Sequence, residues 1–371
     1  MLTRKIYPPT IVFGCDPEFF FTKDGQIIGA EKVLPKEGLQ YDPEKDKTKR
    51  DGDYTSKGES PTSNIIIDGI QAELNPRPNT CRANLGNEIS ACFRKLSTTL
   101  GEQTQIDFSA NVSITEEEMA TLSEASKKFG CAPSKNTYRK RNTISIKDAS
   151  TFYQRSAGGH LHLGDVNNPI IRTSTKKALL SPEKLVPILD IIVGNTCVLI
   201  DRNPGNAERR KVYGKAGEYR TPKHGLEYRT LSNFWLQSYQ LFSLVTNLAR
   251  FSVAIVEASI AGPEDPAGEL LKATKRARIK RAINNNDFDL AMQNFMAIKD
   301  ILLTITPDTG DTPITSKTFD AFLYFIEKGV NHWFKEDPYK HWINLPEGHD
   351  TGWETFLRRT VTQEMLTKKT T

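Results

Sequence analysis

Three short segments with the composition of β-strands each carry two polar, chemically reactive side chains two positions apart. These pairs are Asp16 with Glu18, His160 with His162, and Glu227 with Arg229. Alternate side chains of a strand point to the same face, so both members of a pair share one face, while neighbours such as Phe19 and Phe21 lie on the other. The sequence therefore predicts a sheet with one apolar face and one face that gathers charged groups.

Neighbouring carboxylates on one face repel each other unless a cation lies between them. Carboxylate oxygens together with an imidazole nitrogen are suitable ligands for Mg²⁺ or Mn²⁺, and these ions keep positions open for phosphate oxygens. The segment from 68 to 76 adds Asp68 and Glu73, and a β-bulge at Gly69 would bring their odd spacing to one face. We therefore expect two neighbouring positions for divalent cations.

Arginine and lysine residues are interleaved with glycines between residues 202 and 229. Guanidinium groups bind phosphate through paired hydrogen bonds, and glycines give the backbone freedom to approach it. The sequence thus predicts a phosphate-binding loop with the candidates Arg209, Arg210, Lys215, Arg220 and Arg229. Taken alone, the run from 209 to 223 is also typical of a solvated loop.

The composition of the 371 residues, of which 37% are hydrophobic, is that of a globular protein, and the net charge is +5. This modest charge suits anionic small molecules such as nucleotides, with nucleic acid as a minor alternative partner. The longest apolar runs fall short of the roughly 20 residues that span a bilayer, and no signal sequence precedes the first strand, so we expect a cytoplasmic protein without a membrane partner. The five cysteines lack CxxC spacing, which argues against a disulfide framework or a zinc cluster.

The order of the expected elements indicates an α+β fold. Strands are expected at 10–21 and 26–30, which form a hairpin, and at 64–74, 105–114, 143–146, 152–163 and 218–231. Helices are expected at 85–100, 116–129, 181–200, 238–260, 266–283, 286–303 and 316–334. The polar segment 31–63 is interpreted as a long loop that could cover a site. We expect residues 1–237 to form a sheet-and-helix core and residues 238–371 a mostly helical part packed on the same domain.

Four segments, in this order along the chain, resemble motifs of the superfamily of glutamine synthetase and glutamate-cysteine ligase, in particular its phage-type COOH.NH2 ligases. They are Gly14–Phe21, Gly69–Glu73, Gly158–Gly164, and Arg220 with Leu226–Arg229. The resemblance implies an antiparallel sheet curved into a funnel, with helices packed outside it. It also implies an ATP-dependent carboxylate-amine ligase, which forms an amide or peptide bond through an acyl phosphate and uses Mg²⁺ or Mn²⁺.

The same resemblance assigns a role to each matching residue. It implies one metal position held by Asp16, His160 and Glu227, and a second held by Glu18, Asp68 and Glu73. Arg220 and Arg229 would grip the transferred phosphate, and His162 would lie beside the carboxyl substrate. The spacing between Asp68 and Glu73 departs from that of the classical synthetase. The implied partners are a small carboxylate and an amine, the protein would act in a host cytoplasm if a phage encodes it, and an oligomer is compatible with the sequence.

Other interpretations of the same residues stay open. An acidic pair can lie on a solvated edge, an HxH strand can form hydrogen bonds within a core, and a Glu-x-Arg strand can hold only a stabilising ion pair. The basic cluster from 272 to 281 is most simply the solvated side of a helix. A phosphotransferase acting on a guanidino group, or a catalytically inactive phage protein that binds nucleotides or has a structural role, would fit as alternative functions.

Overall fold

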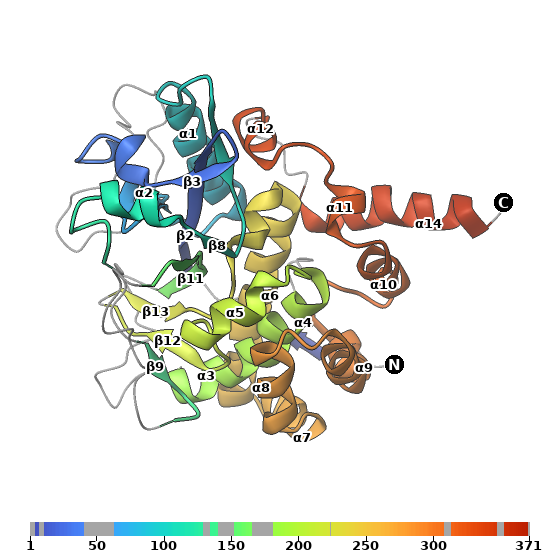
Figure 1. Ribbon diagram of the computed structural model, residues 1–371. Coiled ribbons are helices and arrows are strands. Elements are labelled where there is room, and N and C mark those ends of the chain that lie inside the picture. Colours follow the sequence, from blue (N-terminus) through green and yellow to red (C-terminus); the bar gives the residue numbers. More distant parts are fainter. Residues whose placement is uncertain are drawn as a thin grey trace.

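The computed structural model describes residues 4–6, 11–40, 63–128, 134–139, 152–164, 181–222, 224–307, 313–346 and 352–369. Most of the segment interpreted as a covering loop, residues 41–62, lies outside the described residues, as does the strand expected at 143–146. The described elements form an antiparallel sheet and a group of helices beside it (Figure 1). The expectation of a mixed fold with an antiparallel sheet is confirmed.

Strand β2, Val12–Lys23, is the centre of the main sheet. It pairs with β11 (Gly159–Gly164) along its first half, with β6 (Gln71–Asn75) at Glu18 and Phe19, and with β3 (Gln26–Ile28) and β7 (Thr104–Asp107) along its end. The main path runs β4-β5-β6-β2-β11-β13-β12-β9. The other strands on it are β4 (Leu39–Gln40), β5 (Asn64–Asp68), β13 (Gly225–Tyr228), β12 (Glu218–Arg220) and β9 (Lys135–Asn136). Within the described residues the two ends of this path do not pair, so the sheet is open and the expected funnel is not seen.

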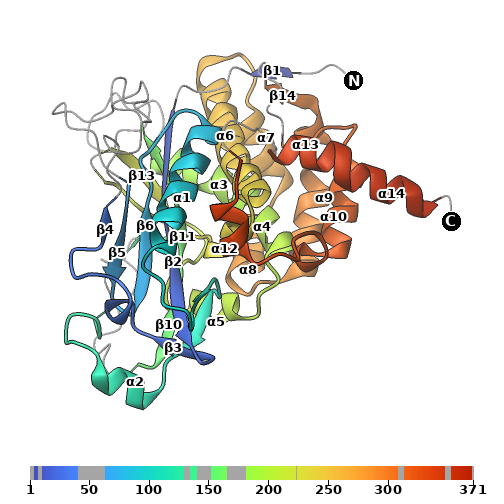
Figure 2. The same cartoon turned by 90° about the horizontal axis from the view of Figure 1, so that it is seen from above.

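The helices cover one face of the sheet, as Figure 2 shows with the strands at the left and most of the helices at the right. The face toward the helices is apolar: Phe19, Leu161, Leu226 and Leu74 from four strands join one hydrophobic cluster with helical residues. Side chains at the alternate positions of the same strands, which include the three predicted pairs, lie on the opposite face. The predicted division of the sheet into an apolar and a charged face is therefore confirmed.

The helices before the long central helix are α1 (Arg82–Ser97), α2 (Glu116–Thr121), α3 (Pro182–Leu189), α4 (Asn195–Ile200) and α5 (Gly205–Val212). After it come α7 (Pro266–Ala273), α8 (Arg276–Asn284), α9 (Phe288–Thr304), α10 (Phe319–Lys328), α11 (Val330–Trp333), α12 (Pro338–Ile343), α13 (Trp353–Phe356) and α14 (Thr362–Lys369). Two short sheets complete the fold, one parallel between β1 (Arg4–Ile6) and β14 (Ile305–Pro307), the other antiparallel between β8 (Asn111–Ser113) and β10 (Gln154–Ser156). In Figure 1, α14 projects away from the body.

The central helix α6, Tyr239–Ala261, is long and apolar enough to cross a membrane by length and composition. The apolar runs of the sequence were expected to be too short for this. However, 83% of its most apolar window is buried inside the structure. Its buried face packs against α1, α3 and α7 and includes Phe242, Leu244 and Val245, which are fully buried. The apolar length of α6 is thus explained by its place in the core.

The segment 64–74 forms a hairpin instead of the single strand that its composition predicts. β5 and β6 pair with each other, and Gly69 turns the chain between them with a φ of +64°, so it is a turn residue and not a bulge. A β-carbon at Gly69 would lie 2.8 Å from the carbonyl oxygen of Lys128. The turn, and not a bulge, is what brings Asp68 and Glu73 near each other.

Other boundaries also differ from the sequence prediction. The strand expected at 105–114 divides into β7 and β8, and the helix expected at 116–129 ends at Thr121, although Thr115 caps its start by accepting a hydrogen bond from Glu118 N. The helix expected at 181–200 is confirmed, with Pro182 at its start and a π-helical turn at Asp190–Gly194 in its middle. Local preference is a weak guide to the ends of an element, because tertiary contacts can override it.

Candidate metal and phosphate site

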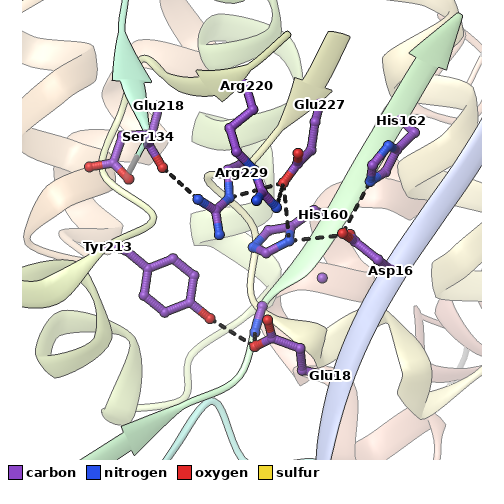
Figure 3. A network of polar contacts seen from close by, with 12 residues as sticks. Asp16, Glu18, Ser134, His160, His162, Tyr213, Glu218, Arg220, Glu227 and Arg229 are labelled. Carbon is purple, nitrogen blue, oxygen red and sulfur yellow. Dashed lines mark hydrogen bonds and ion pairs between the residues drawn. The ribbon is translucent and has the colours of Figure 1, made fainter. Parts of the chain in front are cut away.

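The first group of side chains that could hold a metal ion comes from three neighbouring strands, β2, β11 and β13. His160 lies directly opposite Asp16, and His162 directly opposite Glu227. His160 Nδ1 is 3.2 Å from Asp16 Oδ1 and 3.6 Å from Glu227 Oε1, while His162 Nε2 is 3.1 Å from Asp16 Oδ2 (Figure 3). Asp16, His162 and Glu227 each offer a ligand atom within 4.8 Å of the others. Both histidines therefore face the carboxylates that were expected beside His160 alone.

The second group consists of Glu18, Asp68 and Glu73, whose ligand atoms also lie within 4.8 Å of one another. Glu18 and Glu73 are directly opposite each other on β2 and β6, and the β5–β6 hairpin supplies Asp68. Like charges directly opposite in a sheet destabilise it. The three carboxylates that were expected to share a metal position are thus brought together by the fold.

The chemistry and burial of the side chains in these two groups fit divalent cations. Buried Asp16 Oδ1 and His160 Nδ1 make no hydrogen bond of good geometry to any described residue. Buried polar atoms without such partners are costly, and several carboxylates close together cannot all ionise at neutral pH without a counter-charge. Oxygen atoms from acidic side chains with one or two imidazole nitrogens match the donors that Mg²⁺ or Mn²⁺ prefers.

Burial and mutual repulsion raise the pKa values of the second group. Burial, followed by the neighbouring Asp68, raises the pKa of Glu18 to about 7. Burial and the charges of Asp16 and Glu18 raise the pKa of Glu73 to about 9. Burial and Asp16 likewise raise the pKa of Asp68. A cation between them would remove this penalty, because it favours the ionised form of each carboxylate.

The first group behaves differently, because histidines separate its acids. Burial opposes ionisation of Asp16, but His162 and His160 outweigh it and hold the pKa of Asp16 well below its usual range. Burial disfavours the charged form of His162, yet Asp16 outweighs burial and raises the pKa of His162. Burial lowers the pKa of His160. A neutral His160 beside an ionised Asp16 is the protonation state that metal binding requires.

Two arginines lie beside the first group and contact the same carboxylate oxygen. Arg220 Nη2 is 2.6 Å and Arg229 Nε is 3.0 Å from Glu227 Oε1. Arg229 is 1% exposed and also donates from Nη1 to Ser134 Oγ at 2.8 Å, whereas the Arg220 side chain is 30% exposed. The positive charge expected at this position is therefore present next to the candidate cation ligands (Figure 3).

The three other basic candidates do not gather at this position. Residues 205–212 form helix α5 instead of a loop, and the guanidinium group of Arg209 is buried and donates to the carbonyl oxygens of Arg229, Thr230 and Leu231. Buried Arg210 donates to Asn286 Oδ1. Lys215 Nζ contacts the Lys211 carbonyl oxygen at 3.2 Å. The guanidinium groups of Arg209 and Arg210 thus contact other parts of the chain, and their expected role in binding phosphate stays a prediction.

The two glycines before His160 lie against other parts of the chain. A β-carbon at Gly158 would lie 2.3 Å from His160 Nε2, and one at Gly159 would lie 2.3 Å from the Ser232 carbonyl oxygen and 2.5 Å from Trp235 Nε1. Both glycines therefore make room for the imidazole ring and for the neighbouring chain.

Sequence reasoning missed four residues that contact the site. Tyr213 and Gln71 donate hydrogen bonds to Glu18 Oε2, each at 2.9 Å. His224 Nε2 is 2.8 Å from His162 Nδ1, and the carbonyl oxygen of Glu218 contacts the backbone of Arg229. The tetrapeptide Glu-Tyr-Arg-Thr occurs at both 218–221 and 227–230. In the hairpin of β12 and β13, Arg220 lies opposite Glu227, and Arg229 N donates a hydrogen bond to the Glu218 carbonyl oxygen. That short duplication is the signal that could have identified Glu218.

Residues 131–260 match the family described as phage phiEco32-like COOH.NH2 ligase-type 2. This interval contains β11, β12 and β13 and therefore His160, Arg220, Glu227 and Arg229. This match confirms the resemblance inferred from the sequence motifs. Strand β2 and the β5–β6 hairpin lie outside the matched residues. No curated protein matches the sequence.

Several solved structures are similar to the chain at low sequence identity. A bifunctional glutathione synthetase from Pasteurella multocida has 12% identity and a TM-score of 0.36, with 78% of this chain and 49% of that chain covered. A novel glutamine synthase homolog has 11% identity and a TM-score of 0.31, covering 86% and 71%. GmaS without ligand has 14% identity and a TM-score of 0.33, covering 78% and 69%. The chain thus spans about half the length of the glutathione synthetase that it matches.

Proposed function

We propose that this protein is an ATP-dependent carboxylate-amine ligase that uses Mg²⁺ or Mn²⁺. The observation that carries the proposal is that two groups of candidate metal ligands and two arginines, from six strands and the residue after β13, meet on one face of the sheet. The match of residues 131–260 to a COOH.NH2 ligase family supports the same conclusion independently. The glutamine synthetase-like catalytic fold, with its funnel, is the wider architecture that we propose for this sheet.

Each cation position has a defined set of ligands in this proposal. Asp16, His160 and Glu227 would hold the first cation, and Glu18, Asp68 and Glu73 would hold the second. Bound cations would neutralise phosphate charge. The raised pKa values of Glu18 and Glu73 indicate that these side chains gain most from a bound cation.

The reaction would proceed in two displacements. A carboxylate oxygen of the acid substrate attacks the γ-phosphorus of ATP in line, and the bond to the leaving ADP breaks. Arg220 and Arg229 stabilise the negative charge on the transferred phosphoryl group. The amine then attacks the carbonyl carbon of the acyl phosphate, phosphate leaves, and an amide bond forms after the amine nitrogen loses a proton. Glutamate is a candidate acid by analogy with the superfamily alone.

The two ring nitrogens of His162 both contact neighbouring side chains, and these contacts determine the role that we propose for it. Its Nε2 atom faces Asp16 Oδ2 at 3.1 Å and its Nδ1 atom faces His224 Nε2 at 2.8 Å. We therefore propose that His162 holds Asp16 in place and lies at the edge of the first cation position, next to the substrate carboxylate. Residues 238–371 would complete the same domain, with α6 packed beneath the apolar face of the sheet.

The test is a screen for release of ADP with Mg²⁺, ATP, amino acids and polyamines, followed by hydroxylamine trapping of the acyl phosphate. Glu18→Gln and Arg229→Ala should each reduce turnover roughly 1000-fold, because each removes several kcal/mol of charge stabilisation. Glu208→Gln and Arg281→Ala are matched controls on the surface of α5 and α8 and should retain activity. Circular dichroism establishes that each variant is folded.

Each outcome distinguishes one function from another. A hydroxamate that requires the acid substrate supports the ligase. ADP release with transfer of phosphate to a guanidino compound, and no hydroxamate, identifies the phosphotransferase instead. Full activity in Glu18→Gln contradicts the assignment of the second cation position. Absence of any thermal stabilisation by ATP with Mg²⁺ favours an inactive structural protein, since a ligand that binds the folded state raises its melting temperature.

A further inference from the structure

Tyr213 is the first residue after helix α5 and lies where the two cation groups and the arginines approach one another. The single hydrogen of its hydroxyl group is shared between two acceptors, Glu18 Oε2 at 2.9 Å and the Ser156 carbonyl oxygen at 3.1 Å. Its ring contacts His160 edge-on, with 5.9 Å between ring centroids. One aromatic side chain thus touches a ligand from each proposed cation position (Figure 3).

The ring of Tyr213 is held by two guanidinium groups. Arg209 Cζ lies 4.5 Å and Arg229 Cζ lies 5.5 Å from the ring centroid, which is the range of favourable cation–π contact. Arg209 is in turn fixed by three backbone carbonyl oxygens and packs against Gly214, where a β-carbon would lie 2.2 Å from Arg209 Nη1. Buried Arg209 therefore helps to fix the position of this tyrosine.

Glu18 depends on this support because one of its oxygens accepts several hydrogen bonds. Gly158 N, Gln71 Nε2 and Tyr213 Oη all donate to Glu18 Oε2, at 2.7, 2.9 and 2.9 Å. Three donors that converge on one carboxylate oxygen fix the rotation of the whole carboxylate. Gly158 and Gln71 belong to the sheet, whereas Tyr213 joins the carboxylate to helix α5 and its arginines.

We propose that Tyr213 is a positioning residue that orients Glu18 toward the second cation and couples that cation position to Arg229. The inference rests on the proposed function, because it assumes that Glu18, Asp68 and Glu73 bind a divalent cation. Hydrogen-bond partners of metal ligands commonly change metal affinity about 10-fold to 100-fold when they are removed. Tyr213 does not contact the reacting atoms and acts through Glu18.

Binding of Mn²⁺ to the full chain, followed by electron paramagnetic resonance and isothermal titration calorimetry, tests this role. Tyr213→Phe removes only the hydroxyl group, and we expect it to weaken Mn²⁺ binding about 10-fold to 100-fold. In turnover assays, the Mg²⁺ concentration for half-maximal rate should rise in the same proportion. Gln71→Met removes a second donor to the same Glu18 oxygen and should weaken binding in the same direction.

Tyr228→Phe is the matched control, because Tyr228 donates a comparable buried hydrogen bond, to Asp190 Oδ1 at 2.7 Å, from the other face of the sheet. It should leave Mn²⁺ binding unchanged. Mn²⁺ affinity of Tyr213→Phe within about two-fold of the parent protein would overturn the inference, as would an equal loss in Tyr228→Phe. If the parent protein binds no Mn²⁺, the proposed function itself fails, and this outcome is distinct from failure of the role of Tyr213.

Discussion

The sheet and the C-terminal helices bury opposite kinds of side chain. On the charged face of the sheet Glu18 and His160 are fully buried, and Arg229 is 1% exposed. In the helical part the largest fully buried side chains are aromatic, and Trp353 contacts the rings of Phe325 and Phe356 at centroid distances of 5.0 and 5.8 Å.

This difference indicates which region stabilises the folded state and which region destabilises it. Burying aromatic surface stabilises the folded state, because apolar area leaves water. Burying acids that repel one another destabilises it, unless a ligand supplies the missing charge. We therefore expect changes in the helices to alter stability without altering metal binding, and changes among the acids of the sheet to alter metal binding as well as the pH dependence of stability.

The largest expected effect on stability comes from Trp353→Ala. Trp353 also contacts Phe322, with 6.0 Å between ring centroids, and donates from Nε1 to the Pro313 carbonyl oxygen at 2.8 Å. Loss of this ring should lower the free energy of unfolding by about 3–5 kcal/mol, because the cavity cannot close fully. Urea unfolding measures the change, and Mn²⁺ affinity of the folded fraction should stay as in the parent protein.

Trp333→Ala is the comparison for that experiment, because Trp333 lies in the same aromatic cluster but is only partly buried. It should cost clearly less stability than Trp353→Ala. If Trp353→Ala instead abolished Mn²⁺ binding while the protein stayed folded, the helical part would contribute directly to the site and the division between the two regions would be wrong.

The charged face was predictable from the sequence because strand periodicity alone determines it. The i, i+2 spacing placed the side chains of Asp16 and Glu18 together, and the apolar alternate positions identified the other face. Strand periodicity also placed Glu227 and Arg229 on a shared face, and the register then brought Glu227 opposite His162. A feature that depends only on this two-residue repeat is predictable before any tertiary contact is known.

The contacts of Tyr213 and Arg209 could not be predicted in this way. Tyr213 reaches Glu18 across 195 residues of sequence, and Arg209 faces backbone carbonyl oxygens that only the packed chain brings near. The hairpin at Gly69 was missed for a related reason, since the run from 64 to 74 has strand composition on both sides of the turn. A single glycine can serve either a bulge or a turn, and tertiary contacts decide between them.

The next largest effect concerns the pH dependence of the metal-free protein. The pKa of Glu73 is raised to about 9, so between pH 7 and that value the folded state binds more protons than the unfolded state. The free energy of unfolding should therefore fall as the pH rises from about 7 to about 9. His162, whose pKa is also raised, changes stability in the same direction. Thermal unfolding at several pH values measures the slope.

Glu73→Gln sharpens this prediction, because a neutral amide cannot ionise. The variant should be more stable than the parent protein near pH 9 and should lose most of the slope. Mg²⁺ should raise the melting temperature of the parent protein more at pH 9 than at pH 7, since the cation binds the ionised carboxylates. A parent protein whose stability is independent of pH over this range would contradict the electrostatic account of the second group.

The smallest effect is expected on the solvated side of α7 and its junction with α8, where Lys272 and Lys275 are exposed. Exposed charges are screened by salt and water, so Lys272→Ala with Lys275→Ala should change the free energy of unfolding by no more than about 0.5 kcal/mol. Binding of ATP with Mg²⁺, followed by isothermal titration calorimetry, should be the same as in the parent protein, because both lysines lie on helical elements outside the sheet that carries the proposed site. A large loss of ATP affinity in this double variant would show that the site extends onto these helices. If the parent protein instead binds DNA in a salt-dependent way and the double variant does not, this basic face is a surface for nucleic acid.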